Sequence, residues 1–438
     1  MTFSVQNQYC ASLYKIYAER YYFHYLSNIY TETTMIIKPG KELNVTIDDV
    51  AFGGKGVTRI DGLVCFVAGT VPGEEVKIRI TSVKKRYLEA DLVEVLSASE
   101  DRVEPLCEYY GECGGCQYQH MSYERQLALK VSQLKQVLGR IGGLENIPEL
   151  TKIAASPKAY NYRNKITLNP RKVDENFIVY GYRDIANKHL IEIKECSLAR
   201  EEVNNLIPLI KRTPWGRKNT RREKPRSATM RCTAGDEPII YYGSAPSGMP
   251  WRKESINERE FRVPLGSFYQ INPEVAEELF NTVAEWVAEL DVPRVIDAFC
   301  GAGFLSAGIK DKHIIGIEVD EKSIDAAHYN ALQWGVQSSN YIAGDANKLI
   351  NKHLKNKGDQ TLLILDPPRN GCGEYSIKSI KEHLPAYILY VSCDPATLAR
   401  DLKEICDDNY RVEKLALLDM FPQTSHFESM VLLKKVEK

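Results

Sequence analysis

The chain has 438 residues, a length that favours two or three domains over a single core. Its composition is 44% hydrophobic and 26% charged, and no stretch approaches the roughly 20 continuous apolar residues of a membrane span, so a membrane-spanning chain is excluded. A formal net charge of −1 also excludes nucleic-acid binding through a global positive field, so any such binding must come from local basic patches.

The residues before Met35 are rich in tyrosine but lack the basic start, apolar core and small-residue cleavage site of a signal peptide. We treat residues 1–40 as an uninformative N-terminal extension and expect a cytoplasmic protein. Eleven cysteines in a chain of this kind favour metal binding, catalysis or burial over a disulfide framework.

Residues 41–100 alternate short Val/Ile runs with Gly and Asp turns, which predicts a small β-barrel. The segment 77–86 carries several basic residues, including Lys84, Lys85 and Arg86. They suit phosphate contact on an oligonucleotide-binding barrel, and a solvated basic strand edge explains them equally well.

The central region, residues 101–260, begins with apolar residues at helical spacing over 123–141, which predicts an amphipathic helix ended by two glycines. Strand-like patterning returns over 162–193. Residues 211–226 then place a basic run around Trp215, which is typical either of RNA phosphate and base contacts or of a solvated charged loop.

Three cysteines of this region, Cys107, Cys113 and Cys116, form a C-x5-C-x2-C pattern beside glycines, and Cys196 is a candidate fourth ligand. Three close thiols with flexible glycines indicate a metal site. Zinc held by four thiolates remains an alternative, while an iron–sulfur cluster accounts for the same ligands and for the wider first spacing.

The last region, residues 261–438, alternates strand-like apolar runs with stretches of helix length. This pattern predicts a doubly wound α/β domain. Two final runs, 415–418 and 430–433, predict a terminal antiparallel hairpin with a short turn. The earlier runs are residues 295–296, 314–317, 362–365 and 388–391.

A glycine-containing loop, residues 297–303, follows the first of these strands, where glycines let a backbone approach a cofactor. A dinucleotide fold would place a third glycine where this chain has Ser306. Glu318 ends the next strand, where it could hold a ribose hydroxyl. These features favour S-adenosylmethionine over NAD.

The sequence Asp366-Pro367-Pro368-Arg369 is related to the acid-Pro-Pro motif of methyltransferases that act on exocyclic amines, which place an aromatic residue after it. Here Arg369 takes that place, so the base must be activated in a different way. Cys393 offers one, because it stands where a strand gives way to a helix, whose dipole is expected to lower the thiol pKa against the effect of Asp394.

Thiolate addition to carbon 6 of uracil would make carbon 5 able to take a methyl group from a sulfonium, and a base must then remove the carbon 5 proton. His426 and Glu428 lie two apart at the start of the last strand, so both could face one site. The chemistry alone leaves both residues as candidates.

Together these motifs resemble the RNA uracil-5 methyltransferase family, in its branch with an N-terminal TRAM barrel and a four-iron, four-sulfur cluster. The resemblance covers nearly everything after about residue 40. It implies a multidomain protein with a TRAM barrel at 41–100, a central α+β domain with the cluster at 101–260, and a Rossmann-like class I methyltransferase domain at 261–438. The motifs that carry it, in the family's order, are C-x5-C-x2-C at Cys107, Phe268-Tyr269-Gln270-Ile271-Asn272, residues 297–303, Asp366-Pro367-Pro368-Arg369, Ser392-Cys393-Asp394-Pro395 and His426-Phe427-Glu428.

The resemblance also implies roles for single residues. It makes Cys393 the nucleophile and Glu428 the base, which settles the choice against His426. Phe304 departs from the family, where a small polar residue often follows the glycine loop. The S-adenosylmethionine site is implied to include Gln270, Phe299, Glu318 and Asp366, with Asp345 near the adenine, and the structural 4Fe-4S cluster to be ligated by Cys107, Cys113, Cys116 and Cys196.

For the substrate, the barrel and the cluster cysteines together resemble the enzymes of 23S ribosomal RNA more than the shorter transfer-RNA enzymes. We expect a monomer that methylates a 23S rRNA uridine, with tRNA as the alternative substrate. A non-reacting RNA-binding assembly factor is opposed by the joint presence of Cys393, Glu428 and Gln270. A flavin- and folate-dependent methylase would need a dinucleotide motif that the glycine turn at 53–56 does not provide.

Overall fold

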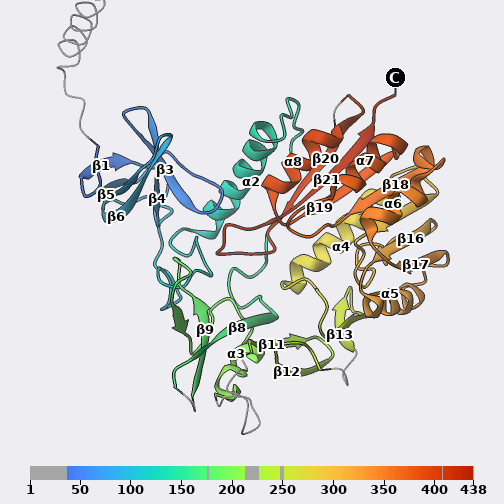
Figure 1. The fold of residues 1–438 in the computed structure, drawn as a ribbon, viewed down its shortest axis with the longest axis horizontal. Helices are drawn as coiled ribbons and strands as arrows, with labels where there is room; N and C mark the ends of the chain where they lie inside the picture. The colour runs from blue at the N-terminus through green and yellow to red at the C-terminus, as the bar shows by residue number, and fades with distance from the viewer. Residues whose placement is uncertain (1–36, 175–176, 213–225, 247–250, 407, 438) are drawn as a thin grey trace, which may run out of the picture. The chain divides into compact units, whose positions relative to one another are not determined.

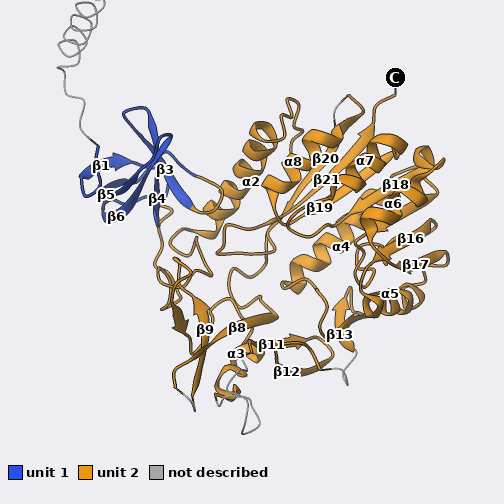
Figure 2. Ribbon diagram, viewed as in Figure 1, with its two compact units in different colours: residues 1–50, 55–99 blue, residues 51–54, 100–438 orange. Residues whose placement is uncertain are grey.

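The computed structural model describes residues 37–437 apart from 175–176, 213–225, 247–250 and 407. The N-terminal extension and most of the basic run around Trp215 lie outside the described residues. The chain divides into two compact units, the first ending at Ser99 and the second comprising residues 51–54 and 100–438 (Figure 2). In the described part of the chain, no helix combines the length and the apolar character needed to cross a membrane.

The first unit is a six-stranded sheet in the order β1-β5-β6-β4-β3-β2, and it occupies the region where the alternating pattern of residues 41–100 predicts the short strands of a small β-barrel. Along β5, Val76, Ile78 and Ile80 are buried while their neighbours are more exposed, so one face of the strand builds the core. The strands are β1 (Glu42–Thr46), β2 (Asp49–Val50), β3 (Lys55–Ile60), β4 (Leu63–Ala68), β5 (Glu75–Val83) and β6 (Tyr87–Ser97).

The second unit opens with helix α2 (Tyr123–Arg140), which matches the predicted amphipathic helix. The Ser122 hydroxyl caps it by accepting a hydrogen bond from the Arg125 amide at 3.3 Å. A five-stranded sheet in the order β10-β9-β8-β11-β12 and a β13–β14 hairpin follow (Figure 1). Their bounds are β8 (Lys165–Lys172), β9 (Ile178–Arg183), β10 (Leu190–Glu192), α3 (Glu201–Asn204), η1 (Ile207–Leu209), β11 (Ala228–Thr233), β12 (Asp236–Tyr242), β13 (Trp251–Ile256) and β14 (Arg259–Pro264).

The rest of the second unit is an eight-stranded sheet in the order β17-β16-β15-β18-β19-β21-β20-β7, with helices on both faces (Figure 1). Val295 and Ile296 of β15 belong to two different hydrophobic clusters, because successive side chains point to opposite faces. The elements are α4 (Pro273–Ala288), β15 (Arg294–Ala298), β16 (His313–Glu318), α5 (Glu321–Gln333), β17 (Ser339–Ala343), α6 (Ala346–Leu354), η2 (Gly358–Gln360), β18 (Thr361–Leu365), α7 (Glu374–His383), β19 (Tyr387–Ser392), α8 (Pro395–Cys406), β20 (Tyr410–Leu418) and β21 (Glu428–Lys435).

Two features of this sheet differ from the sequence-based expectation. The terminal hairpin is present, but residues 419–427 connect its strands in place of a short turn. In addition, β7 (Lys152–Ala154), from the segment after α2, pairs in parallel with β20 and forms an edge of the sheet. Both features depend on contacts between segments far apart in the sequence, which local patterning does not report.

Candidate active site

A cavity of about 1380 Å³ lies where the parallel strands β15, β16, β18 and β19 end. Carboxyl ends of parallel strands are the usual ligand site of open α/β sheets. The cavity brings together all the residues predicted for catalysis and cofactor binding, which are Gln270, Phe299, Glu318, Asp345, Asp366, Cys393 and Glu428.

The loop after β15 forms one wall of the cavity and is built for close backbone approach. Phe299, Gly301 and Gly303 have positive φ angles of 65°, 52° and 77°. A Cβ on residue 303 would lie 3.2 Å from the Cβ of Ala327, so only glycine fits there without displacement. The Gly301 amide donates a hydrogen bond to Glu318 Oε2 at 3.2 Å, which holds the loop against the end of β16.

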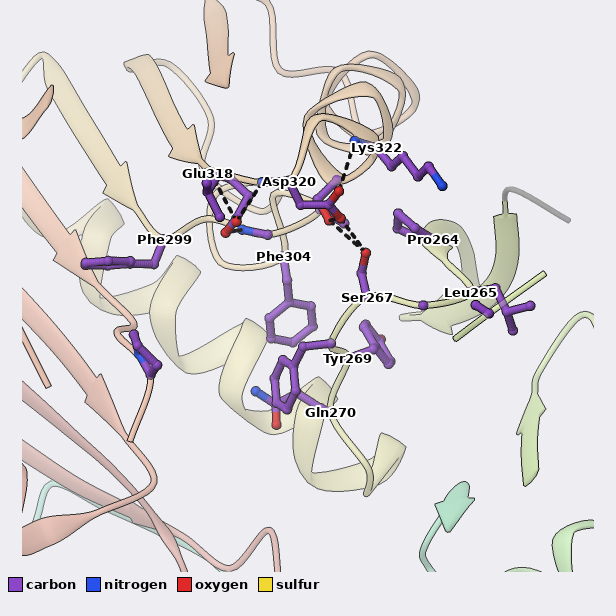
Figure 3. Close-up of a pocket in the computed structure, with 18 of the residues that line it drawn as sticks. Pro264, Leu265, Ser267, Tyr269, Gln270, Phe299, Phe304, Glu318, Asp320 and Lys322 are labelled. Atoms are coloured by element: carbon purple, nitrogen blue, oxygen red, sulfur yellow. Dashed lines mark hydrogen bonds between the residues drawn. The ribbon is translucent and has the colours of Figure 1, made fainter. Parts of the chain in front are cut away.

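Glu318 is fixed by the backbone around it, as Figure 3 shows. Its Oε1 accepts hydrogen bonds from the amides of Val319 at 2.7 Å and Asp320 at 3.1 Å. Asp320 caps α5 and also accepts a hydrogen bond from the Ser267 hydroxyl at 2.7 Å, so the loop before α4 is tied to the same wall. Glu318 therefore stands at a defined place where a ribose hydroxyl could be bound.

Asp345 lies at the edge of this site. It caps α6 by accepting a hydrogen bond from the Asn347 amide at 3.0 Å, and its side chain is 45% exposed. It lines the cavity, but its cap role alone explains its residue type.

Gln270 and Asp366 supply polar side chains to the cavity, of which Gln270 is buried and Asp366 is half-buried. Within the described part of the chain, Gln270 Oε1 has no hydrogen-bond partner although it is buried. Burial, followed by the charges of Asp297 and Glu318, raises the pKa of Asp366 to about 7. Buried polar atoms without partners are costly in a folded chain and are explained when a ligand completes them.

Asp297 was predicted only as the start of the glycine loop, yet it is the most deeply buried acid near the cavity. Neither carboxylate oxygen has a hydrogen-bond partner among the described residues, and burial raises its pKa to about 7. The signal in the sequence was an acidic residue inside an apolar strand, at the end of Val295-Ile296-Asp297.

Cys393 follows β19 and lines the cavity, but its acidity is the opposite of the expectation. Burial, followed by the charge of Glu428, raises the thiol pKa to about 11, while the Arg369 guanidinium beside it acts in the lowering direction. The start of α8 is already capped, because Asp394 Oδ1 accepts from the amides of Ala396 at 3.0 Å and Thr397 at 2.9 Å. Desolvation and neighbouring acids therefore outweigh the helix dipole.

Glu428, the first residue of β21, also lines the cavity, whereas His426 is not among the described residues that line it. Burial and then the charge of Asp366 raise the pKa of Glu428 well above its usual range, and Arg369 partly offsets this. The His426 ring instead meets the rings of Phe52 and Phe421 edge to face, with centroids 6.4 and 6.3 Å apart.

Phe304, the predicted departure from the family pattern, is part of an aromatic cluster next to the glycine loop (Figure 3). Its ring centroid lies 5.7 Å from that of Tyr269 and 6.1 Å from that of Phe261, both in edge-to-face geometry. The position therefore joins the glycine loop to the segment that carries Gln270.

The four cysteines predicted as metal ligands lie in the central region, and none of them is among the residues that line the cavity. All four are free thiols, and the charges of the others contribute to raising the pKa of Cys113 and of Cys116, the latter to about 12, although burial is the main cause. The segment is held by the Gly114 amide, which donates to the Arg183 carbonyl at 3.0 Å. In the described part of the chain, no three His, Cys, Asp or Glu side chains form a group that could hold a metal ion.

Parallel strands with a glycine loop after one, an acid at the end of the next, and a cavity beside both form a nucleotide-cofactor site of the kind that S-adenosylmethionine-dependent methyltransferases share with other open α/β enzymes. Residues 252–436 match the family model described as tRNA (Uracil-5-)-methyltransferase, and residues 38–93 match that of the TRAM domain. The chain belongs to the RNA uracil-5 methyltransferase family and is an S-adenosylmethionine-dependent enzyme.

Relatives and a solved structure agree with this assignment. An uncharacterized RNA methyltransferase of Thermosynechococcus vestitus is 32% identical over 90% of this chain and 98% of its own length. Another from Clostridium acetobutylicum is 30% identical over 93% of this chain and 100% of its own length. The fold is similar to that of the Pyrococcus abyssi tRNA (uracil-54, C5)-methyltransferase in complex with S-adenosyl-L-homocysteine, with a TM-score of 0.67, 22% identity, and 89% of this chain and 100% of that chain covered.

Proposed function

We propose that the protein transfers a methyl group from S-adenosylmethionine to carbon 5 of a uridine in 23S ribosomal RNA, through a covalent bond between Cys393 Sγ and carbon 6 of the base. The observation that carries the proposal is that Cys393 and Glu428 line the same cavity as the glycine loop and Glu318. A nucleophile, a base and a cofactor site thus face one volume, as this chemistry requires.

The cofactor supplies an electrophilic methyl group on a sulfonium when it is bound. The residues present fit it, because Glu318 stands at a strand end and Gln270 Oε1 is buried without a partner among the described residues. Asp366 adds a carboxyl group that a cationic ligand would favour in its ionised form.

The protein residues then act in sequence on the uracil. Cys393 first gives its proton to water, which the positive charge of Arg369 favours, and its thiolate adds to carbon 6. The carbon 5–carbon 6 electron pair moves toward the carbon 4 carbonyl, and carbon 5 takes the methyl group. Glu428, as a carboxylate, removes the carbon 5 proton, and the electron pair of that bond expels the Cys393 thiolate.

We further propose a structural 4Fe-4S cluster on Cys107, Cys113, Cys116 and Cys196. The C-x5-C-x2-C spacing and the free state of all four thiols support it, since four cysteines are the usual ligand set of such clusters. The cluster would join the 107–116 segment to Cys196 across most of the central region, and the methyl transfer needs no electron from it.

Nucleoside analysis tests the function. The protein is incubated anaerobically with labelled S-adenosylmethionine and unmodified transcripts of 23S rRNA and of tRNA. Labelled 5-methyluridine in the 23S transcript supports the proposal. If only tRNA is labelled, tRNA, which the description of the matching family model names, replaces 23S rRNA as the proposed substrate. If neither RNA is labelled, a non-catalytic RNA-binding role is favoured.

A further inference from the structure

One wall of the cavity comes from the central sheet and carries positive charge that the methyl-transfer steps do not use. Arg163, Lys165 and Thr167 all line the cavity; Lys165 and Thr167 are alternate residues of β8 and share a face, and Arg163 comes just before the strand. Thr229 lies opposite Thr167 on β11, and their hydroxyls are 3.0 Å apart. This wall is thus polar and basic where it meets the substrate volume.

The placement of charges on this wall costs stability. Lys165 lies directly opposite Arg231 in the β8–β11 pair, and like charges in that position repel. Arg231 is neutralised by a buried ion pair with Glu254 at 2.8 Å, with side chains 1% and 3% exposed. Burial and the charges of Arg231 and Arg163 lower the pKa of Lys165, as expected for a cation that lacks an anion.

Two acids of this region, Glu274 and Asp236, are paired with other cations, and the acids that line the cavity, Asp366 and Glu428 among them, form no ion pair with Lys165 in the described part of the chain. Glu274 accepts from Arg200 at 2.8 Å, and Asp236 lies 3.6 Å from Arg252. No carboxylate among the described residues forms an ion pair with Arg163 or Lys165.

Hydrogen bonds hold the two cations beside the reacting groups. Asn164, between them, donates from Nδ2 to the Gln270 carbonyl at 3.2 Å and from its amide to the Ile271 carbonyl at 2.9 Å. On the other side, the Tyr162 hydroxyl donates to the Pro422 carbonyl at 3.1 Å, in the connection that leads to Glu428. The segment 162–165 is therefore tied both to the segment that carries Gln270 and to the connection that precedes Glu428.

We propose that Lys165, with Arg163, binds a backbone phosphate of the RNA next to the target uridine and so positions that nucleotide over Cys393. The inference rests on the proposed function, since it names the residues that hold its substrate. Arg163 Nε donates to the Lys165 carbonyl at 3.0 Å, and two cations without a carboxylate partner beside two hydroxyls are typical phosphodiester contacts. The carboxylate of the cofactor is the competing anion, and the cofactor residues Phe299, Glu318 and Asp366 stand on the opposite sheet.

The test compares Lys165→Gln with Lys165→Arg and with Lys403→Gln, an exposed lysine on α8 that does not line the cavity. Filter binding to the 23S rRNA and tRNA transcripts is measured over a range of KCl concentrations. Lys165→Gln should bind about tenfold more weakly than the wild type to whichever unmodified transcript the wild-type enzyme methylates. Its slope of log affinity against log salt should be smaller by about one. Lys165→Arg should retain most of both quantities, and Lys403→Gln should equal the wild type.

Unchanged RNA affinity and salt slope in Lys165→Gln overturn the inference, as does a loss of S-adenosylmethionine affinity in place of RNA affinity. The melting temperature and the S-adenosylmethionine affinity of each variant are also measured. Wild-type values exclude a folding defect, because a folding defect would lower both quantities. Failure of the proposed function is detected separately, because the wild-type protein would then produce no 5-methyluridine in the nucleoside analysis.

Discussion

Burial raises the pKa of both Cys393 and Glu428, and so disfavours the thiolate and the carboxylate that the reaction needs. Arg369 acts in the opposite direction on both groups. A cationic cofactor brought into the same cavity would act in the same sense as Arg369. Positive charge near the cavity therefore favours the ionised, reactive form of both the nucleophile and the base.

Glu428→Gln should accumulate a covalent adduct between the protein and its RNA. The variant can add Cys393 to carbon 6 and methylate carbon 5, but it lacks the carboxylate that removes the carbon 5 proton, so the thiolate is not expelled. The measurement is a shifted band on a denaturing gel with labelled RNA. Cys393→Ala, the control, should bind S-adenosylmethionine normally and give no adduct and no product; an adduct in that variant would contradict the assignment.

Binding of S-adenosylmethionine should tighten as the pH rises from 6 to 8. Asp366, with a pKa of about 7, is protonated below this value and ionised above it, and only the carboxylate attracts a cation. Below the pKa, affinity can change by up to about tenfold per pH unit for one group. Calorimetry with S-adenosylhomocysteine, which lacks the sulfonium charge, should give a flatter profile; equal profiles for both ligands would refute the link.

Between elements, the connection of residues 419–427 is held by helix α2 through buried polar contacts. Lys130 Nζ donates to Asp419 Oδ1 at 2.7 Å and to the Phe421 carbonyl at 3.1 Å, and both charged side chains are 0% exposed. Gln126 and Gln423 exchange a second pair of bonds at 3.0 and 2.9 Å. These contacts fix the chain that leads into Glu428.

Lys130→Met should destabilise the protein by about 3–5 kcal/mol, because it leaves the Asp419 carboxylate buried without its cation. Urea unfolding gives the magnitude. In the double variant with Asp419→Leu, the charge is also removed and much of the lost stability should return. If the single variant were as stable as the wild type, the pair would not hold the connection in the way described.

Whether an element could be predicted depends on how far apart in the sequence its contacts lie. The helix at 123–141 and the strands after Arg294 were predictable, since their patterns are local. The excursion at 419–427 was not, because its anchor Lys130 lies 289 residues from Asp419 in the sequence. The raised pKa of Cys393 was missed for the same reason, since it depends on Glu428 and on burial in the folded cavity.

At the scale of the whole molecule, the central region should contain iron. Protein purified without oxygen should carry about four iron atoms per chain and absorb visible light, as a 4Fe-4S cluster does. Cys196→Ser should lose most of the iron and melt at a lower temperature. Cys406→Ala, which removes a buried thiol of α8, should keep the iron. Zinc in place of iron in the wild-type protein would contradict the cluster.

Strand β7 has a consequence for dissecting the molecule. It lies before the central sheet in the chain, yet it closes the outer edge of the methyltransferase sheet by pairing with β20. A fragment starting near residue 261 would expose the unpaired amides and carbonyls of β20, which recruit strands of other chains. Such a fragment is expected to aggregate, so truncation studies of this enzyme need residues 152–154 retained.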